Sequence, residues 1–296
     1  MNASRLVGPG LTIGLCAMGG MAMPGGALGA PLAQQQQIEI KNAAARVVVA
    51  PEDRQDVTYE VLAGDPRLPL RIRHQGHKLI IDGGIKRERF RGCEVHVDPN
   101  GRRSGDVHVA GLGQIAWSQI PQVTIYTPRS VKLTASGAVF GSVGRAGDLY
   151  LANDGCGDWT LADVSGRLHV NQAGAGSSRA GRAGSAQLLV AGSGGVSMGD
   201  VGGDLVIDMA DAGEVRVASV NGALRVRVAG PGGARIEGGR ATAMNASVAG
   251  AGSVIFYGVA QSLKATIAGS GDIRAARVIG KVEKQTIGSG KVIAGR

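Results

Sequence analysis

A two-glycine turn that recurs about every 19 residues constrains the fold of this chain more than any other feature. The steps between successive turns are 18 to 20 residues long. The second glycine of the turn stands at Gly137, Gly157, Gly176, Gly194, Gly213, Gly232, Gly252, Gly271 and Gly290. A period this regular indicates one short structural unit that is repeated and stacked, as in solenoid proteins.

The segments on either side of the turn have the pattern of β-strands. Within residues 224–228, apolar residues alternate with Arg225 and Arg227, and the alternation resumes after the turn over residues 234–236. A period of two is typical of a strand with one buried and one solvated side. No helical period of useful length appears in residues 131–296, so each repeat is expected to contain strands only.

Three columns of mostly apolar residues keep fixed distances from the turn glycine. Eight residues before it stand Leu149, Leu168, Ala186, Leu205, Leu224, Met244, Leu263 and Val282. Two residues after it stand Val139, Trp159, Ser178, Val196, Val215, Ala234, Val254, Ile273 and Val292. Seven residues after it stand Gly144, Val164, Ala183, Val201, Val220, Gly239, Val259 and Val278. Three inward columns predict a three-sided coil, whose core becomes continuous only when coils stack.

We therefore predict that residues 131–296 form an all-β, parallel β-solenoid of about eight regular coils. The corners between strands need a positive φ, which glycine adopts without steric cost. The chirality of parallel crossover connections favours a right-handed winding.

The N-terminal segment has the pattern of an export signal. Residues 6–33 carry no charge, and residues 11–18 form an apolar run that is followed by small residues. This is typical of a secretory signal peptide over residues 1–33, and the alternative is an uncleaved membrane anchor. With the signal removed, no transmembrane span is expected, and the protein is predicted to lie in the periplasm or at the cell surface.

Residues 34–130 contain strand-like runs but lack the two-glycine turn. The runs fall at residues 38–41, 46–49, 57–61, 70–73 and 78–81. We predict irregular opening coils or a small β cap here, because the end of a solenoid needs protection against edge-to-edge pairing. Residues 83–115 are polar and rich in arginine, and we expect a long loop or a flexible hairpin.

Two cysteines, Cys93 and Cys156, remain after the predicted signal cleavage. In an oxidising compartment they are candidates for a disulfide, and the alternative is two unpaired thiols. Cys156 lies between two turn glycines and is therefore expected to be exposed. Cys93 and His96 have a metal-like spacing, but zinc sites use four ligands. No metal or other cofactor is predicted.

Composition and acid placement argue against several functions. The net charge of +9 is dispersed and aromatic residues make up only 3% of the chain, whereas nucleic-acid binding uses a clustered basic face or stacking aromatics. The acids beside the turn glycine, Asp158, Glu214 and Asp272, never fall on neighbouring coils. This placement disfavours the paired carboxylates of a solenoid lyase or hydrolase, and it disfavours calcium-binding repeats.

One outward column is basic. Three residues after the turn glycine stand Phe140, Thr160, Arg179, Ser197, Arg216, Arg235, Ile255, Arg274 and Ile293. Arg216 and Arg235 fall on adjacent coils, about 4.8 Å apart at strand spacing, where like charges repel. Glu214 or Asp208 is a candidate to neutralise them, and so is an anionic glycan. We therefore take Arg179, Arg216, Arg235 and Arg274 as candidate anion or glycan contacts, with an ordinary solvated face as the alternative.

The C-terminal repeats resemble a known family. The turns that begin at Gly250, Gly269 and Gly288, with the strand Leu263-Lys-Ala-Thr-Ile-Ala, are similar to those of the GIN domain. That family is described as an autotransporter adhesin head and is grouped with domains of unknown function. The resemblance covers about residues 38–296 and is strongest from residue 131. It implies a β-solenoid in an exported protein of the Gram-negative envelope, and it carries no catalytic residues.

These features lead to one main functional hypothesis and two alternatives. We expect an exported, non-catalytic β-solenoid of the cell envelope that acts as an adhesin-like or glycan-binding module. The first alternative is a structural envelope protein that self-associates end to end through an open C-terminal coil. The second is a carbohydrate-active enzyme.

Overall fold

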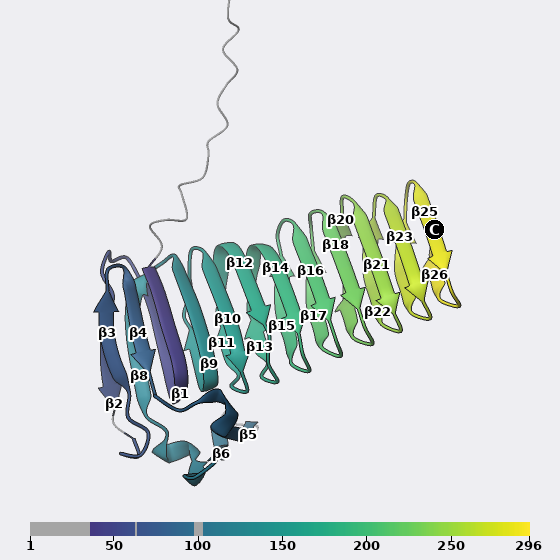
Figure 1. The fold of residues 1–296 in the computed structure, drawn as a ribbon. Coiled ribbons are helices and arrows are strands. Elements are labelled where there is room, and N and C mark those ends of the chain that lie inside the picture. The colour runs from purple at the N-terminus through teal and green to yellow at the C-terminus, as the bar shows by residue number, and fades with distance from the viewer. Residues whose placement is uncertain (1–35, 63, 98–102) are drawn as a thin grey trace, which may run out of the picture. The chain divides into compact units, whose positions relative to one another are not determined.

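The computed structural model describes residues 36–62, 64–97 and 103–296. They form an all-β parallel solenoid, as predicted, in which the coils follow one another along the chain from β9 to the C-terminus (Figure 1). The predicted signal peptide, residues 1–33, lies outside the described residues. Within the described part of the chain, no helix has the length and apolarity needed to cross a membrane.

Each regular coil consists of two strands joined by the two-glycine turn. The strands before the turn, which we call the first sheet, are β10 (Leu149–Gly155), β12 (Val164–Gln172), β14 (Ala183–Ala191), β16 (Leu205–Ala210), β18 (Leu224–Ala229), β21 (Met244–Gly250), β23 (Leu263–Gly269) and β25 (Val282–Ile287). The strands after the turn, the second sheet, are β11 (Trp159–Leu161), β13 (Ser178–Ala180), β15 (Gly195–Val201), β17 (Glu214–Val220), β19 (Gly233–Ile236), β22 (Ser253–Ala260), β24 (Asp272–Val278) and β26 (Lys291–Ala294). The long strand β9 (Val131–Val143) runs through both sheets, and β20 (Arg240–Ala241) is a short corner strand. From β9 onward there are about nine coils.

The strand register largely confirms the three predicted inward columns. In the first column, Leu149 pairs with Leu168 and every later member pairs with the next one along. Side chains from both sheets fill one continuous hydrophobic core. The outward side chains of the two sheets therefore lie on separate faces of the solenoid.

The column predictions were wrong at four positions where the coils are irregular. Trp159 lies opposite Gly141 rather than Val139. In the third column, Ala146 replaces Gly144 at the start. Further along that column, Ala260 rather than Val259 pairs with Val278, and the buried residue opposite Ala260 is Ala241 rather than Gly239. The register shifts in β22 between Phe256 and Val259. As a result, Ala260 instead of Val259 points inward.

The two glycines of the turn have different roles. Gly250 adopts a φ of +117°, which is the left-handed conformation predicted for the corner. Gly252 is instead required by close packing, because a Cβ there would lie 2.4 Å from the carbonyl oxygen of Gly232 in the preceding coil. The second glycine was predicted from its period alone, and the structure shows that coil-to-coil contact is the reason for it.

The N-terminal strands close one end of the solenoid in an order that differs from the chain order. Strand β1 (Gln36–Glu52) lies between β9 on one side and β4 (Lys78–Asp82) with β8 (Gln122–Pro128) on the other, all in parallel. Strand β3 (Arg71–Gln75) pairs antiparallel with β4, and β2 (Thr58–Leu62) pairs antiparallel with β8. The predicted cap therefore consists of two antiparallel strands laid on an opening coil (Figure 1).

The described residues of the polar segment 83–115, namely 83–97 and 103–115, are more ordered than predicted. They contain a 3-10 turn (Arg87–Arg89) and three antiparallel strands, β5 (Phe90–Val97), β6 (Arg103–Val109) and β7 (Gly113–Ala116), followed by a second 3-10 turn (Trp117–Gln119). The long-loop interpretation was wrong, and the hairpin interpretation holds for β5 and β6.

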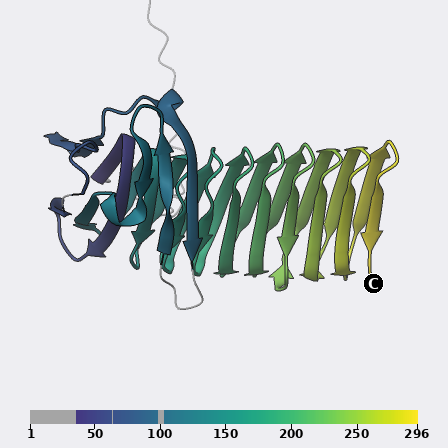
Figure 2. The ribbon, with the colours of Figure 1, turned by 90° about the horizontal axis from the view of Figure 1, so that it is seen from below.

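This three-stranded sheet has its own hydrophobic cluster on the flank of the first coils. Val107, Val109 and Ile115 are fully buried there, together with Ala138 and Phe140 of β9. Phe140 was predicted to point outward in the basic column, and it does point away from the main core, but the three-stranded sheet covers it. In Figure 2 the later coils form one row that ends at the C-terminus, and the N-terminal strands lie at the other end of that row.

Candidate functional site

A pocket of about 310 Å³ lies on the outward face of the second sheet. Its outward residues come from four successive coils: Asp158, Ser177, Gly195 and Glu214 directly after the turn, and Thr160, Arg179, Ser197 and Arg216 two positions later. Val95 of β5 also contributes to the lining. The pocket therefore lies where the three-stranded sheet approaches the solenoid face.

The register of the second sheet fixes the spacing of the two arginines. Arg179 lies opposite Ser197, and Ser197 lies opposite Arg216. Two strand spacings, about 10 Å, therefore separate the backbones of Arg179 and Arg216. The small residues Gly195 and Ser197 on the strand between them leave room for the hollow.

Three of the four predicted arginines are held by carboxylates of this chain. Arg216 pairs with Glu214 at 2.8 Å, and Arg274 pairs with Asp272 at 3.8 Å. Arg235 is hydrogen-bonded to Glu237, which raises the pKa of the Arg235 guanidinium above its ordinary value. These three carboxylates neutralise the arginines and so reduce the repulsion between like charges within the column.

Arg179 differs from the other three. It is exposed and lines the pocket, and it makes no ion pair with any residue that the structure describes. Asp208, the other predicted neutralising acid, pairs with Arg227 on the first sheet at 3.2 Å. The structure therefore brings Arg179 and Arg216 together in one pocket, whereas Arg235 and Arg274 lie outside its lining.

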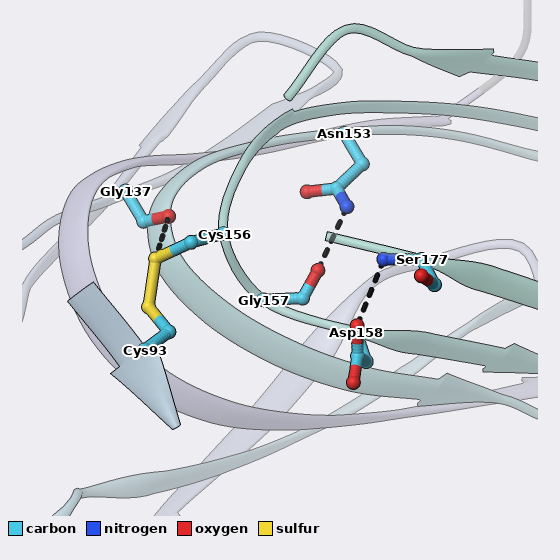
Figure 3. The surroundings of a disulfide bond; sticks show 7 residues. All are labelled: Cys93, Gly137, Asn153, Cys156, Gly157, Asp158 and Ser177. Atoms are coloured by element: carbon cyan, nitrogen blue, oxygen red, sulfur yellow. Dashed lines mark hydrogen bonds between the residues drawn. A yellow bond between two sulfur atoms is a disulfide. The ribbon is translucent and has the colours of Figure 1, made fainter. Parts of the chain in front are cut away.

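Cys93 and Cys156 form a disulfide with a Cα–Cα distance of 5.9 Å (Figure 3). The bond ties β5 to the turn between β10 and β11. Cys156 is half-buried rather than exposed as predicted, because β5 lies against the turn. Nearby, Arg87 in the 3-10 turn before β5 forms an ion pair at 2.8 Å with Asp154 at the end of β10.

A buried polar cluster beneath the pocket was not predicted. The Asn153 side-chain amide donates to the carbonyl oxygen of Gly157 at 2.8 Å (Figure 3) and to Gln172 Oε1 at 3.2 Å. Ser178 Oγ donates to the same Gln172 oxygen at 2.8 Å. All three side chains are fully buried. The only sequence signal was a polar residue at an inward position, Ser178, within an otherwise apolar column.

The carboxylate of Asp158 is fixed at the pocket rim. Its Oδ1 accepts a hydrogen bond from the backbone N–H of Ser177, one coil later, at 2.8 Å (Figure 3). Similar links between adjacent coils are made by Asp148, Asp163, Asp204 and Asp272. These acids therefore link adjacent coils of the solenoid.

Among solved structures, three bacterial proteins are similar to this chain. A protein of Parabacteroides distasonis described as a "putative lipid binding protein" is 17% identical, with a TM-score of 0.52 over 89% of this chain and 93% of that chain. A "putative adhesin" of Parabacteroides merdae is 15% identical, with a TM-score of 0.49 over 89% and 92%. A "putative adhesin" of Bacteroides fragilis is 13% identical, with a TM-score of 0.45 over 88% and 93%. At such identities the first of these likenesses supports the fold alone.

The comparison with protein families is more specific. A search of curated proteins gives no match. Residues 118–276, which are more than half of the chain, match the family model described as "Putative auto-transporter adhesin, head GIN domain". The matched segment starts just before β8 and ends in β24, so it includes most of the glycine-turn coils and the pocket on the second sheet. The chain therefore belongs to the GIN head-domain family.

Proposed function

We propose that this protein is an exported, non-catalytic β-solenoid of the cell envelope that binds a carboxylate-bearing glycan through the pocket on the second sheet. The observation that carries the proposal is the exposed guanidinium of Arg179, which has no carboxylate partner among the described residues although the other arginines of its column have one. Membership of the GIN family and the predicted signal peptide at residues 1–33 support a place in the envelope.

The chemistry of the pocket suits a sugar with an isolated negative charge. The planar guanidinium of Arg179 can donate two parallel hydrogen bonds to one carboxylate. The carboxylates of Asp158 and Glu214 accept hydrogen bonds, and the Ser197 hydroxyl both donates and accepts. Two arginines and two acids give the lining no net formal charge. Such a lining favours a hydroxyl-rich ligand with few charges over a dense polyanion.

The spacing of the pocket acids supports binding rather than hydrolysis. Asp158 and Glu214 lie three coils apart in the second sheet, which is roughly 14 Å at strand spacing. Glycosidases hold their two carboxyl groups about 5 to 9.5 Å apart. Each acid is also engaged, Asp158 by the Ser177 amide and Glu214 by Arg216. We therefore expect the glycan to be bound without cleavage.

The test compares Arg179→Ala with Arg274→Ala. Both changes remove one positive charge from the same column, but Arg274 lies outside the pocket. Binding to a soluble uronate oligosaccharide, measured by isothermal titration calorimetry, should weaken about tenfold or more in Arg179→Ala because one charge-assisted contact is lost. Arg274→Ala should bind like the wild type. Equal affinities for the two variants would show that the pocket is not the binding site.

A further inference from the structure

A second pocket, of about 320 Å³, lies on the outward face of the first sheet. Its polar lining comes from three adjacent strands, β18, β21 and β23, and consists of Arg225, Arg227, Asn245, Ser247, Lys264 and Thr266. We call it the first-sheet pocket. It shares no residue with the pocket on the second sheet, and its residues were not among the predicted glycan contacts.

The strand register arranges these six side chains in two rows of three. One row contains Arg225, Asn245 and Lys264, which lie opposite one another across the three strands. The central position is a neutral amide, and a cation stands one strand spacing away on each side.

The second row runs parallel to the first, two residues further along each strand. It contains Arg227, Ser247 and Thr266. This row adds a third cation and two hydroxyl groups, so the central strand presents an amide and a hydroxyl between charged neighbours.

The charged residues that line the first-sheet pocket are all positive. This pocket carries three cations and no carboxylate in its lining, whereas the pocket on the second sheet has equal numbers of both signs. Arg227 is paired with Asp208 at the edge of the pocket. Arg225 makes no ion pair within the part of the chain that the structure describes. Two of the three cations therefore remain available to a ligand.

Lys264 has one acid nearby, but that acid is occupied. Glu283 lies opposite Lys264 on β25, and its carboxylate is bound by Lys281. The pKa of Glu283 is lowered mainly by its hydrogen bond to Lys281, and the charge of Lys264 makes a smaller contribution in the same direction. The N–H donors of the Lys264 ammonium therefore remain available to a ligand in the pocket.

We propose that the first-sheet pocket binds the phosphate group of a monoester. A tetrahedral dianion offers several acceptor oxygens, which match a guanidinium fork, an ammonium, an amide N–H and hydroxyls arranged around one hollow. Arg225 and Lys264 are about 10 Å apart at strand spacing, which is comparable with the screening length of about 8 to 10 Å near physiological salt. A bound dianion relieves their mutual repulsion. The site does not depend on the glycan proposal, because it uses other residues on another face.

The experiment is an NMR titration of the folded protein with inorganic phosphate, which follows the backbone amides of β18, β21 and β23. The variant is Arg225→Ala/Lys264→Ala. The control is Arg240→Ala/Arg277→Ala, which removes the same charge from two exposed arginines outside the pocket. We expect saturable shifts in the wild type and in the control, and affinity at least about tenfold lower in the pocket variant. Arg179→Ala should titrate like the wild type, which separates this site from the glycan pocket.

A second arm identifies the source of the anion. The same proteins are sedimented with vesicles of phosphatidylcholine that contain phosphatidic acid, whose headgroup is a phosphate monoester. Loss of vesicle binding in the pocket variant but not in the control would assign the group to a lipid headgroup. Loss of phosphate binding alone would assign it to a soluble ester, and either result supports the site. Equal binding by variant and control, or no binding of either probe by the wild type, would overturn the proposal.

Discussion

The missing side chain of Gly141 makes room for the largest buried side chain of the core. Trp159 lies directly opposite Gly141 and is 1% exposed. A Cβ at position 141 would lie 2.1 Å from Cζ3 of the indole ring. Later coils carry Val196 or Val215 at the position of Trp159 and need no such gap. The size of this tryptophan is therefore tolerated only because its neighbour is glycine.

We expect Gly141→Ala to lower the free energy of unfolding by about 1–3 kcal/mol, because the added methyl group overpacks the core. The measurement is urea unfolding followed by circular dichroism. In a Trp159→Val background, the same change should cost much less, since the ring is gone. Gly92→Ala is the control, because a Cβ there would meet nothing within 4 Å. Equal costs in the two backgrounds would contradict this account.

At the scale of elements, the three-stranded sheet is held to the solenoid by a few specific contacts. Its apolar side packs on Ala138 and Phe140. The Cys93–Cys156 disulfide joins β5 to the turn beyond β10, and the Arg87–Asp154 ion pair joins the 3-10 turn before β5 to the end of β10. The disulfide spans 63 residues in sequence, and it anchors the side of the sheet that faces the pocket on the second sheet.

We expect Cys93→Ser/Cys156→Ser to release this sheet before the coils unfold. Closing a loop of this length stabilises a protein by about 2–4 kcal/mol, and the coils keep their own continuous core. Limited proteolysis with mass spectrometry should show faster cleavage within residues 83–116 than in the wild type. Arg87→Ala should have little effect, because exposed ion pairs contribute little. Unchanged cleavage of the double variant would refute the anchoring role.

At the scale of the whole solenoid, the two ends of the coil stack are protected differently. Strands β2 and β3 lie antiparallel over the opening coil. In the coil formed by β25 and β26, Lys284 occupies an inward position opposite Ala265, and its ammonium donates to the carbonyl oxygen of Val292 at 3.1 Å. An inward charge on an edge strand opposes pairing with another chain. We therefore expect Lys284 to disfavour end-to-end self-association through β25.

We expect Lys284→Ala to promote concentration-dependent self-association. The change restores alanine to the inward column and removes the charge that another coil would have to desolvate. Molar mass from light scattering after size exclusion, over a range of concentrations, checks this. Lys281→Ala is the matched control, because its charge pairs with Glu283 outside the core. A variant that stays as monomeric as the wild type would show that Lys284 does not protect this edge.

The sequence by itself determined the regular part of the molecule. A period of about 19 residues, strand alternation and small turn residues are local features that each coil repeats, so stacking them leads to one architecture. The family resemblance, the parallel solenoid and most of the inward columns followed from this repetition. The basic column was also correct in its register from Thr160 onward.

Only the tertiary structure decided the features that depend on residues far apart in the chain. The place of β1 between β8 and β9, the burial of Phe140 and the fit of Trp159 over Gly141 each depend on a partner segment that no local pattern specifies. The same holds for function. Glu214 stands two residues before Arg216, and Ser177 stands at the matching place before Arg179, but only the structure shows that both arginines line one pocket. The first-sheet pocket exists because three strands, each 19 or 20 residues from the next, bring the cations of β18 and β23 and the polar side chains of β21 to one face.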